Sequence, residues 1–285
     1  MINNIKNTIE QRIDEPVVSM HLLAETAPSR IYLVRAGGHY IVKESKKSDI
    51  EQEFGYHKAI YEYWLSERSQ WEFGIPKPYF LSDDQQFFMM EYIEGDNLLR
   101  ILLRGTGDVK GLFRQTGKYL RQFHDMTTAY LTHQTKPLTE CETIKKLMAG
   151  SRRSRLKTCL EAFSDITSQA IFKDFTPSNV VISQTGRVYF LDYHDLGYCA
   201  PFYYDLARFV DTTRVFGLIR GLPNSVINFY RVRQALEGFL EGYGDDVESS
   251  LLKKMQIVHR KEHVRKKLDV SLWRGVLLWL TYLVI

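Results

Sequence analysis

The chain has 285 residues, enough for one large domain or two modest ones, each with a sizeable hydrophobic core. Its apolar fraction of 44% and charged fraction of 25% are those of an ordinary globular protein, which excludes a largely disordered chain. The formal net charge of +4 suits an anionic ligand but is too small to indicate a nucleic-acid-binding protein. No apolar run reaches the roughly 20 residues of a membrane span.

Three cysteines, Cys141, Cys159 and Cys199, are an odd number without the spacing of metal ligands. No signal peptide precedes them at the start of the sequence. The sequence therefore predicts free thiols in a reducing compartment and a cytoplasmic protein.

The N-terminal third predicts one helix followed by strands. Isoleucines at helical spacing predict an amphipathic helix over residues 2–13, which Pro16 ends. Period-two patterns with glycine-containing turns then predict an antiparallel sheet. Its first three strands are expected at residues 17–23, 30–34 and 40–44.

A second helix is predicted over residues 50–65, and residues 73–78 break its pattern with a glycine and two prolines. Residues 78–82 and 87–95 then predict a further hairpin, in which Met89 and Met90 point to opposite faces because successive strand residues alternate. Beyond Gly95 the pattern is mostly helical, with helices expected at 97–103, 109–126, two segments across 143–169, 225–243, 247–267 and one to the C-terminus.

Residues 171–195 are the exception within this helical part. Two short apolar strands, 180–182 and 188–191, flank a turn that contains Gly186. Asn179 precedes the first strand and Asp192 follows the second, so antiparallel pairing would set their side chains at the same end. Asp174 lies five residues before Asn179. Each residue alone is ordinary turn chemistry, but together they predict a divalent-metal site beside a lone carboxylate.

The run from Asp174 to Asn179, Asp-Phe-Thr-Pro-Ser-Asn, fits the D-x-x-x-x-N catalytic loop of protein kinases, and Asp192 stands where their metal-binding Asp lies. With Tyr-Tyr-Asp205-Leu-Ala downstream, the pattern most resembles the aminoglycoside phosphotransferase and choline kinase branch. The resemblance implies an α+β, two-lobed protein-kinase-like fold, with an N-terminal antiparallel sheet and one helix, and a larger, mainly helical C-terminal lobe. The lobes are expected at residues 1–93 and 94–285.

The resemblance also implies roles for these residues. Asp174 is the expected catalytic residue, which orients the acceptor hydroxyl and accepts its proton. Asn179 and Asp192 are the expected ligands of Mg²⁺, and ATP is the expected phosphoryl donor.

Lys43 ends a predicted strand as in the V-A-I-K motif, whose lysine contacts the nucleotide phosphates. Among neighbouring charges it also fits a solvated lysine at a strand end. Glu53 is expected to pair with Lys43, and Glu51 is the alternative partner.

Three further residues are expected at the nucleotide. Glu91 and Ile93 fall in a segment that resembles the hinge whose backbone groups bind adenine. The glycine-rich loop of protein kinases is absent, and Ser29 with neighbouring N–H groups fits either a phosphate-binding loop or a plain hairpin turn.

The chain departs next to Asp174 from the family that it resembles. Phe172 stands where the family has a histidine, and Lys173 precedes the Asp in place of a glycine. Phe172 is expected to fill the histidine's space as a core residue, and Lys173 either stabilises the transferred phosphoryl group or merely occupies the position of the arginine in the protein-kinase loop. Asp195 is a candidate second metal or substrate contact, and Asp205 is expected to accept hydrogen bonds from the catalytic loop.

The favoured interpretation is an ATP- and Mg²⁺-dependent phosphotransferase acting on a hydroxyl of a small molecule such as a sugar, amino alcohol or aminoglycoside-like compound. One alternative is a kinase of a membrane-linked sugar or lipid precursor, with weak membrane-surface contact through the basic residues 259–267 and the apolar tail. Another is a pseudokinase that binds nucleotide or a partner without turnover. The sequence indicates neither the acceptor nor the oligomeric state.

Overall fold

The structure is a computed structural model that describes residues 2–26, 29–45, 50–67, 70–131, 136–140, 144–145, 149, 153–166, 168–194, 196–219 and 225–270. The chain forms two compact units. Unit 1 consists of Met1–Gly95 and Ser183–His194, and unit 2 of Asp96–Ile182 and Asp195–Ile285. The predicted division at residue 93 placed all of Ser183–His194 in the C-terminal lobe, whereas this segment packs with the N-terminal part of the chain.

Unit 1 is built on an antiparallel sheet of five strands in the order β1-β2-β3-β5-β4. The strands are β1 (Ser19–Glu25), β2 (Ser29–Ala36), β3 (Gly38–Ser45), β4 (Pro78–Leu81) and β5 (Phe87–Glu91). In this register Lys43 of the central strand lies opposite Ile31 on one side and Phe88 on the other. The strand pattern of the sequence therefore predicted the sheet, and it places Lys43 on the strand at its centre.

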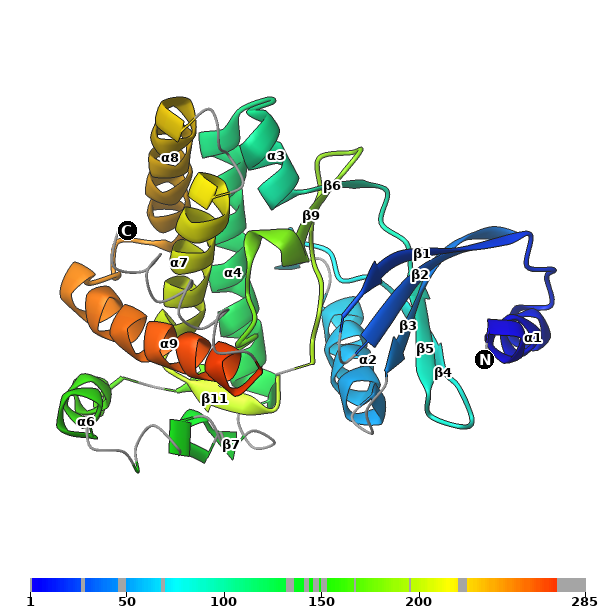
Figure 1. Ribbon diagram of the computed structural model, residues 1–285, viewed down its shortest axis with the longest axis horizontal. Helices are drawn as coiled ribbons and strands as arrows, with labels where there is room; N and C mark the ends of the chain where they lie inside the picture. Colours follow the sequence, from blue (N-terminus) through cyan, green and yellow to red (C-terminus); the bar gives the residue numbers. More distant parts are fainter. Residues whose placement is uncertain are drawn as a thin grey trace. The chain divides into compact units, whose positions relative to one another are not determined.

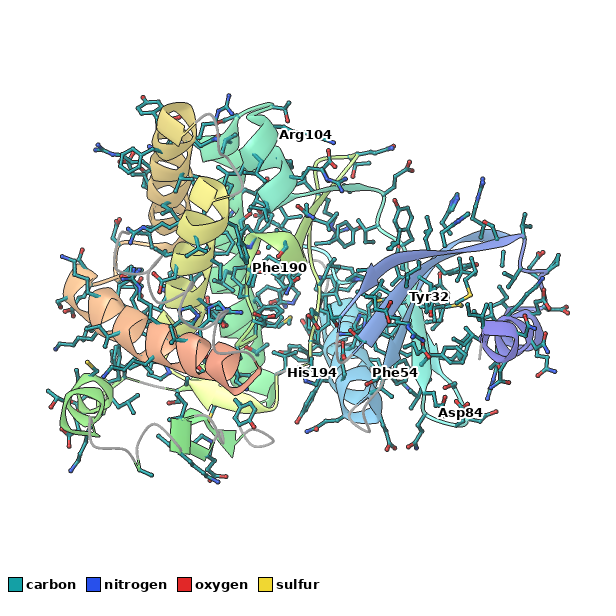
Figure 2. All side chains as sticks on the ribbon, in the orientation of Figure 1. Tyr32, Phe54, Asp84, Arg104, Phe190 and His194 are labelled. Carbon is teal, nitrogen blue, oxygen red and sulfur yellow. The ribbon has the colours of Figure 1, made fainter. Side chains whose placement is uncertain are left out.

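Helix α1 (Ile2–Ile13) covers one face of this sheet (Figure 1). Ile5 and Ile9, one turn apart, are buried in a cluster that includes Tyr32, labelled in Figure 2, and Met89. Met90, the next residue on β5, is half-buried outside this cluster, as strand alternation predicted. The resemblance implied one helix on the sheet, but α1 is a second one because its isoleucine stripe needs an apolar face to cover.

Helix α2 (Ile50–Ser66) packs on β4 and β5. Its buried side chains include Ile60 and Trp64, and Trp64 donates its indole N–H to the Phe73 carbonyl at 3.1 Å. His57 is also buried, and burial lowers its pKa to about 4 even though its Nε2 is bonded to the Pro76 carbonyl at 2.7 Å. These two bonds attach α2 to the loop that the prolines create.

Unit 2 is mainly helical. Helix α3 (Leu98–Arg104) begins where Asn97 caps it, with Oδ1 accepting from Arg100 N at 2.8 Å, and it ends at Gly105 in the left-handed conformation. The remaining helices are α4 (Val109–Leu131), α6 (Arg153–Glu161), α7 (Tyr203–Ile219), α8 (Ser225–Tyr243) and α9 (Ser249–Val270). The last helix predicted, over the C-terminal residues, lies outside the described residues.

Short strands lie in the segments that connect these helices. Strand β11 (Tyr198–Ala200) pairs with β7 (Lys136–Pro137) in parallel and with β8 (Gln169–Ala170) antiparallel. A 3₁₀ turn, η3 (Pro177–Asn179), leads into β9 (Val180–Ser183). A tight turn, in which Gly186 N donates to Ser183 O at 2.9 Å, then leads to β10 (Val188–Phe190), so both apolar strands predicted here are present. Strand β6 (Gly95–Asn97) precedes α3.

Helices α4 and α8 approach closely because glycines face the opposite backbone. A Cβ on Gly242 of α8 would overlap the carbonyl oxygen of Arg114, and one on Gly117 of α4 would overlap that of Phe239. Both overlaps involve helix backbone, which cannot move aside as a flexible side chain can. The absence of side chains at these positions therefore sets the distance between the two helices.

We expect Gly242→Ala to lower the free energy of unfolding by about 1–3 kcal/mol, the usual cost of overpacking. The matched control is Gly55→Ala in α2, where a Cβ would meet nothing within 4 Å and a gain of about 0.5–1 kcal/mol is expected from helix propensity. Urea unfolding of both variants checks this, and an unchanged stability of Gly242→Ala would contradict the packing.

No helix in the part of the chain that the structure describes has the length and apolar character needed to cross a bilayer.

Candidate functional site

In unit 1, three predicted site residues meet around the Lys43 ammonium group. Its Nζ lies 2.5 Å from Oε1 of Glu53 on α2 and 2.9 Å from Oδ1 of Asp192, which is 149 residues away in the sequence. The Lys43 and Glu53 side chains are 14% and 6% exposed, whereas Asp192 is 34% exposed. The partner of Lys43 is thus Glu53, as the resemblance implied, and the alternative partner Glu51 is exposed.

The two carboxylates determine the charge state of this cluster. Burial opposes the charged form of Lys43, but the charges of Asp192 and Glu53 outweigh it and raise the Lys43 pKa. Burial likewise opposes ionised Glu53, but His194 and Lys43 together lower the Glu53 pKa. At neutral pH Lys43 is therefore an ammonium group held in place between two carboxylates, and this ammonium group is a donor suited to phosphate oxygens.

Asp192 is held by its neighbour Tyr193. The Tyr193 ring is buried and stacked on His57 with centroids 4.7 Å apart, and its hydroxyl donates to the Phe190 carbonyl at 2.7 Å. Asp192 itself adopts φ of 68°, the left-handed region that non-glycine residues rarely occupy. Strained backbone of this kind is maintained where packing fixes the flanking residues, as Tyr193 does here.

In unit 2, Asp174 and Asn179 share one loop. The side-chain Nδ2 of Asn179 donates to the backbone carbonyl of Asp174 at 3.0 Å, and its own N–H donates to Thr176 O at 2.9 Å within η3. With Nδ2 engaged in this way, the amide orientation is fixed and Oδ1 is the atom left to act as a ligand. The Asp174 side chain is 44% exposed.

Buried Asp205 organises the residues before Asp174. Its Oδ2 accepts from Phe172 N at 2.8 Å, and its Oδ1 accepts from Lys173 N at 2.9 Å. Oδ2 also lies 3.1 Å from Nε2 of His124, which is fully buried. Asp205 thus accepts bonds from the catalytic loop as the resemblance implied, and it supports Lys173 at a φ of 60°.

The Lys173 side chain is buried and lies over the Tyr198 ring, with Nζ 4.3 Å from the ring centroid. A cation held over an aromatic face is stabilised where it lies. This contact holds the Lys173 ammonium group against Tyr198, which argues against the role of stabilising the transferred phosphoryl group.

Phe172 fills the place of the family's histidine as a core residue. Its ring is 1% exposed and stacks on Phe123 with centroids 4.1 Å apart, with Phe175 at 5.2 Å. These rings give the Phe172 side chain apolar neighbours, against which burying an imidazole is costly.

We expect Phe172→His to remain active and to lose about 1–3 kcal/mol of stability, the cost of a buried polar group without a partner. Melting temperature and turnover measured on the same preparations check this. An inactive parent that the histidine activates would show instead that the parent is a decayed kinase.

Glu91, Ile93 and Ser29, the residues expected at the adenine and the phosphates, lie in backbone segments with their own contacts. The backbone N–H of Glu91 donates to Lys77 O at 2.8 Å, so this N–H is already engaged within unit 1. A carboxylate oxygen of Glu91 accepts from Lys77 N at 3.0 Å. Ile93 is half-buried after the end of β5. The Ser29 N–H donates to Thr26 Oγ1 at 3.2 Å, which favours the hairpin-turn interpretation.

A family model described as the phosphotransferase enzyme family, APH, matches residues 21–249. The chain belongs to this family. The match spans the Lys43 cluster, the Asp174 loop and Asp205, and it identifies the protein as a small-molecule phosphotransferase that acts on hydroxyl groups. No curated protein matches the sequence.

Solved structures of other phosphotransferases share the fold. An aminoglycoside 2′-phosphotransferase-IIIa variant in its GDP complex aligns with a TM-score of 0.63 and 15% identity, over 98% of this chain and 97% of that one. The streptomycin–ATP complex of APH(2″)-IIa aligns at 0.62 and 12%, over 97% and 95%. Macrolide 2′-phosphotransferase MphH from Brachybacterium faecium aligns at 0.61 and 11%, over 94% and 93%. The two-lobed α+β kinase-like fold is therefore confirmed.

No site role was predicted from the sequence for three residues that contact the predicted site of this phosphotransferase directly or through one another. His194 Nδ1 lies 3.7 Å from Glu53 Oε2 in unit 1. In unit 2, Arg208 contacts Asp174 through Nε at 3.0 Å and also through Nη2, and His259 contacts Arg208. The only sequence signal was for Arg208, which lies one helical turn after Asp205 and so on the same side of α7.

Asp195, the candidate second contact, lies outside the described residues. Within the described ranges, no group of three or more His, Cys, Asp or Glu side chains is arranged to hold a metal.

Proposed function

We propose that this phosphotransferase transfers the γ-phosphoryl group of ATP, with Mg²⁺, to a hydroxyl group of a small molecule. The observation that carries this proposal is the Lys43 ammonium group held between Glu53 and Asp192 at 2.5 and 2.9 Å. Phosphoryl transfer needs positioning and charge neutralisation more than covalent chemistry, and a lysine fixed by a glutamate is the usual means of holding the α- and β-phosphates.

The residues present fit Mg²⁺. Asn179 and Asp192 offer an amide oxygen and a carboxylate, both hard oxygen donors, and Mg²⁺ in nucleotide sites needs only one or two protein ligands besides water and phosphate. The bond from Asn179 Nδ2 to Asp174 O orients its amide as such a ligand requires. When bound, the metal would neutralise charge on the β- and γ-phosphates.

The chain's own residues account for the remaining steps. Lys43 binds phosphate oxygens. Glu53 keeps the Lys43 side chain extended from β3. Asp174 accepts a hydrogen bond from the acceptor hydroxyl and finally its proton, for which its partly exposed carboxylate is suited. Ile93 and the carbonyl of Glu91 are the proposed adenine contacts. Ser29 is assigned only a role in the hairpin turn.

The family supports a small molecule as the acceptor. The similar structures include complexes with streptomycin and with GDP, and one acts on macrolides, so both nucleotide and acceptor vary among them. We propose a sugar, amino alcohol or aminoglycoside-like acceptor. Within the stretch 259–267, on which the membrane-linked alternative rests, His259 and Glu262 are buried, so these two side chains do not face a membrane surface.

An acceptor screen tests the proposal. Release of ADP or GDP is measured with Mg²⁺ and each nucleotide against aminoglycosides, macrolides, sugars and amino alcohols, and products are identified by a mass gain of one phosphoryl group. We expect acceptor-dependent release with at least one class. Nucleotide binding without any phosphorylated product across the panel would favour the pseudokinase.

A further inference from the structure

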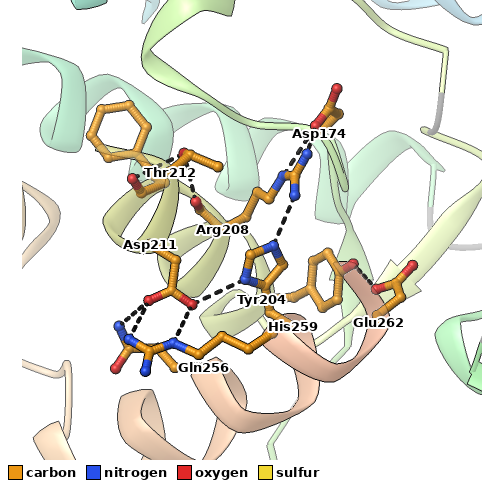
Figure 3. A network of polar contacts seen from close by, with 10 residues as sticks. Asp174, Tyr204, Arg208, Asp211, Thr212, Gln256, His259 and Glu262 are labelled. Carbon is orange, nitrogen blue, oxygen red and sulfur yellow. Dashed lines mark hydrogen bonds and ion pairs between the residues drawn. The ribbon is translucent and has the colours of Figure 1, made fainter. Parts of the chain in front are cut away.

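Arg208 of α7 makes a two-point contact with the proposed catalytic carboxylate. Its Nε lies 3.0 Å from Oδ1 of Asp174, and its Nη2 contacts the same oxygen. Figure 3 shows the other Asp174 oxygen directed away from the guanidinium group. Because two donors of a planar group converge on Oδ1, they restrict the position of this oxygen more than a single flexible contact would, and so limit how the carboxylate can be turned.

Arg208 is held in turn by His259 of α9. The Arg208 side chain is 16% exposed, and its Nη1 lies 2.9 Å from Nε2 of His259, which is 1% exposed. An arginine can only donate, so Nε2 accepts, and the ring proton must be on Nδ1, which lies 3.1 Å from Oδ2 of Asp211. Burial, with the nearby Arg208 charge, lowers the His259 pKa against the opposing effect of Asp211, which keeps the ring neutral.

Asp211 anchors this chain of contacts. It is fully buried, and it accepts from Arg260 Nε at 3.0 Å and Nη2 at 2.8 Å and from Gln256 Nε2 at 2.9 Å. Burial opposes its charge, but the bonds from His259 and Arg260 outweigh burial and lower the Asp211 pKa. A buried carboxylate with four donors is rigid, so it transmits its position through His259 to Arg208.

We infer that Arg208 is a positioning residue for Asp174 and that His259, fixed by Asp211, holds Arg208 in the orientation that aims the carboxylate at the acceptor hydroxyl. This role rests on the proposed function, because it acts through Asp174. It differs from a plain structural ion pair, since the direction of the Asp174 carboxylate and not only the fold depends on it.

Arg208→Ala tests the first link. We expect turnover to fall about 100-fold, the scale of a misaligned general base, with nucleotide KM unchanged and with about tenfold recovery when guanidinium chloride is added at millimolar concentration. Arg233→Ala is the control, because it removes an arginine from an exposed pair with Glu237 and should change nothing. Parent-like turnover, faster turnover, or a loss that guanidinium leaves unchanged would overturn the inference.

Two substitutions at His259 test the second link. Glutamine places its amide near the position of Nε2 and can still accept from Arg208, whereas asparagine replaces Nδ1 and retains only the bond toward Asp211. Because both remove the imidazole, they should lower the melting temperature similarly. We expect His259→Asn to lose at least about tenfold more turnover than His259→Gln, and equal losses would overturn the inference.

Labelling of Asp174 by a carbodiimide and an amine, quantified by peptide mass spectrometry, gives a readout that does not need turnover. It should be faster in Arg208→Ala and His259→Asn than in the parent and His259→Gln. If labelling follows this order while no acceptor is phosphorylated, the proposed function fails but the contact chain stands. If acceptors are phosphorylated and labelling is the same in all four proteins, the positioning role fails alone.

Discussion

Asp174→Asn is expected to leave nucleotide binding nearly intact and to lower turnover by at least about 100-fold. The amide is isosteric and can still accept from Arg208 through its oxygen, and the Asn179 bond is to the backbone at this position. Structure is therefore retained, but an amide cannot take the hydroxyl proton. Turnover with the acceptor found in the screen and nucleotide affinity by calorimetry measure the two effects separately.

Asp125→Asn is a matched control for this variant, because it neutralises a carboxylate that is 60% exposed and paired only with Arg121 among the contacts that the structure gives. It should match the parent in both measurements. Normal turnover of Asp174→Asn would remove Asp174 from the role of base, and a large loss of nucleotide affinity would assign it to the nucleotide instead.

Asp192→Ala is expected to weaken Mg²⁺-dependent nucleotide binding by at least about tenfold, which corresponds to about 1.4 kcal/mol. The variant removes the proposed charged metal ligand, but Glu53 still holds Lys43 at 2.5 Å, so binding of nucleotide without metal should fall little. Calorimetric titrations of ATP with Mg²⁺ and with EDTA distinguish the two contributions.

Asp83→Ala serves as the control for Asp192→Ala, because its side chain is 84% exposed in the β4–β5 turn of the same unit. Equal affinity of Asp192→Ala and the parent for Mg·ATP would end the assignment of Asp192 as a metal ligand. A similar loss with and without Mg²⁺ would show that Asp192 acts through Lys43 alone.

Local patterns predicted the elements of this protein well, because they arise from interactions between near neighbours in the chain. The isoleucines of α1 and the alternation in β2 and β3 each indicate which face is buried. The cap at Asn97 and the turn at Gly186 are likewise encoded within four residues. The Lys43–Glu53 pair was accessible only through family resemblance, since nothing local links a strand-end lysine to one glutamate on the following helix.

The contacts of Arg208 could not be predicted in either way. They join residues 34 and 51 positions apart, and the sequence around His259 looks like a basic surface helix. Its burial depends on how α9 packs on α7, which the sequence period does not specify. Residue patterns thus indicate which side chains could be functional, whereas tertiary packing decides which of them meet.

The return of Ser183–His194 to unit 1 limits how this protein can be divided. Gly74 N donates to Val188 O at 2.8 Å, Phe190 N donates to Gly74 O at 3.2 Å, and the rings of Phe73 and Phe190 stack 5.3 Å apart. A fragment cut at Gly95 would lose this strand, expose Phe73 and lack the Asp192 carboxylate. A chimaera designed to exchange nucleotide preference between relatives would therefore need both stretches of unit 1 from the same parent. A single crossover after Gly95 would pair Lys43 of one parent with the residue that the other parent has at the position of Asp192.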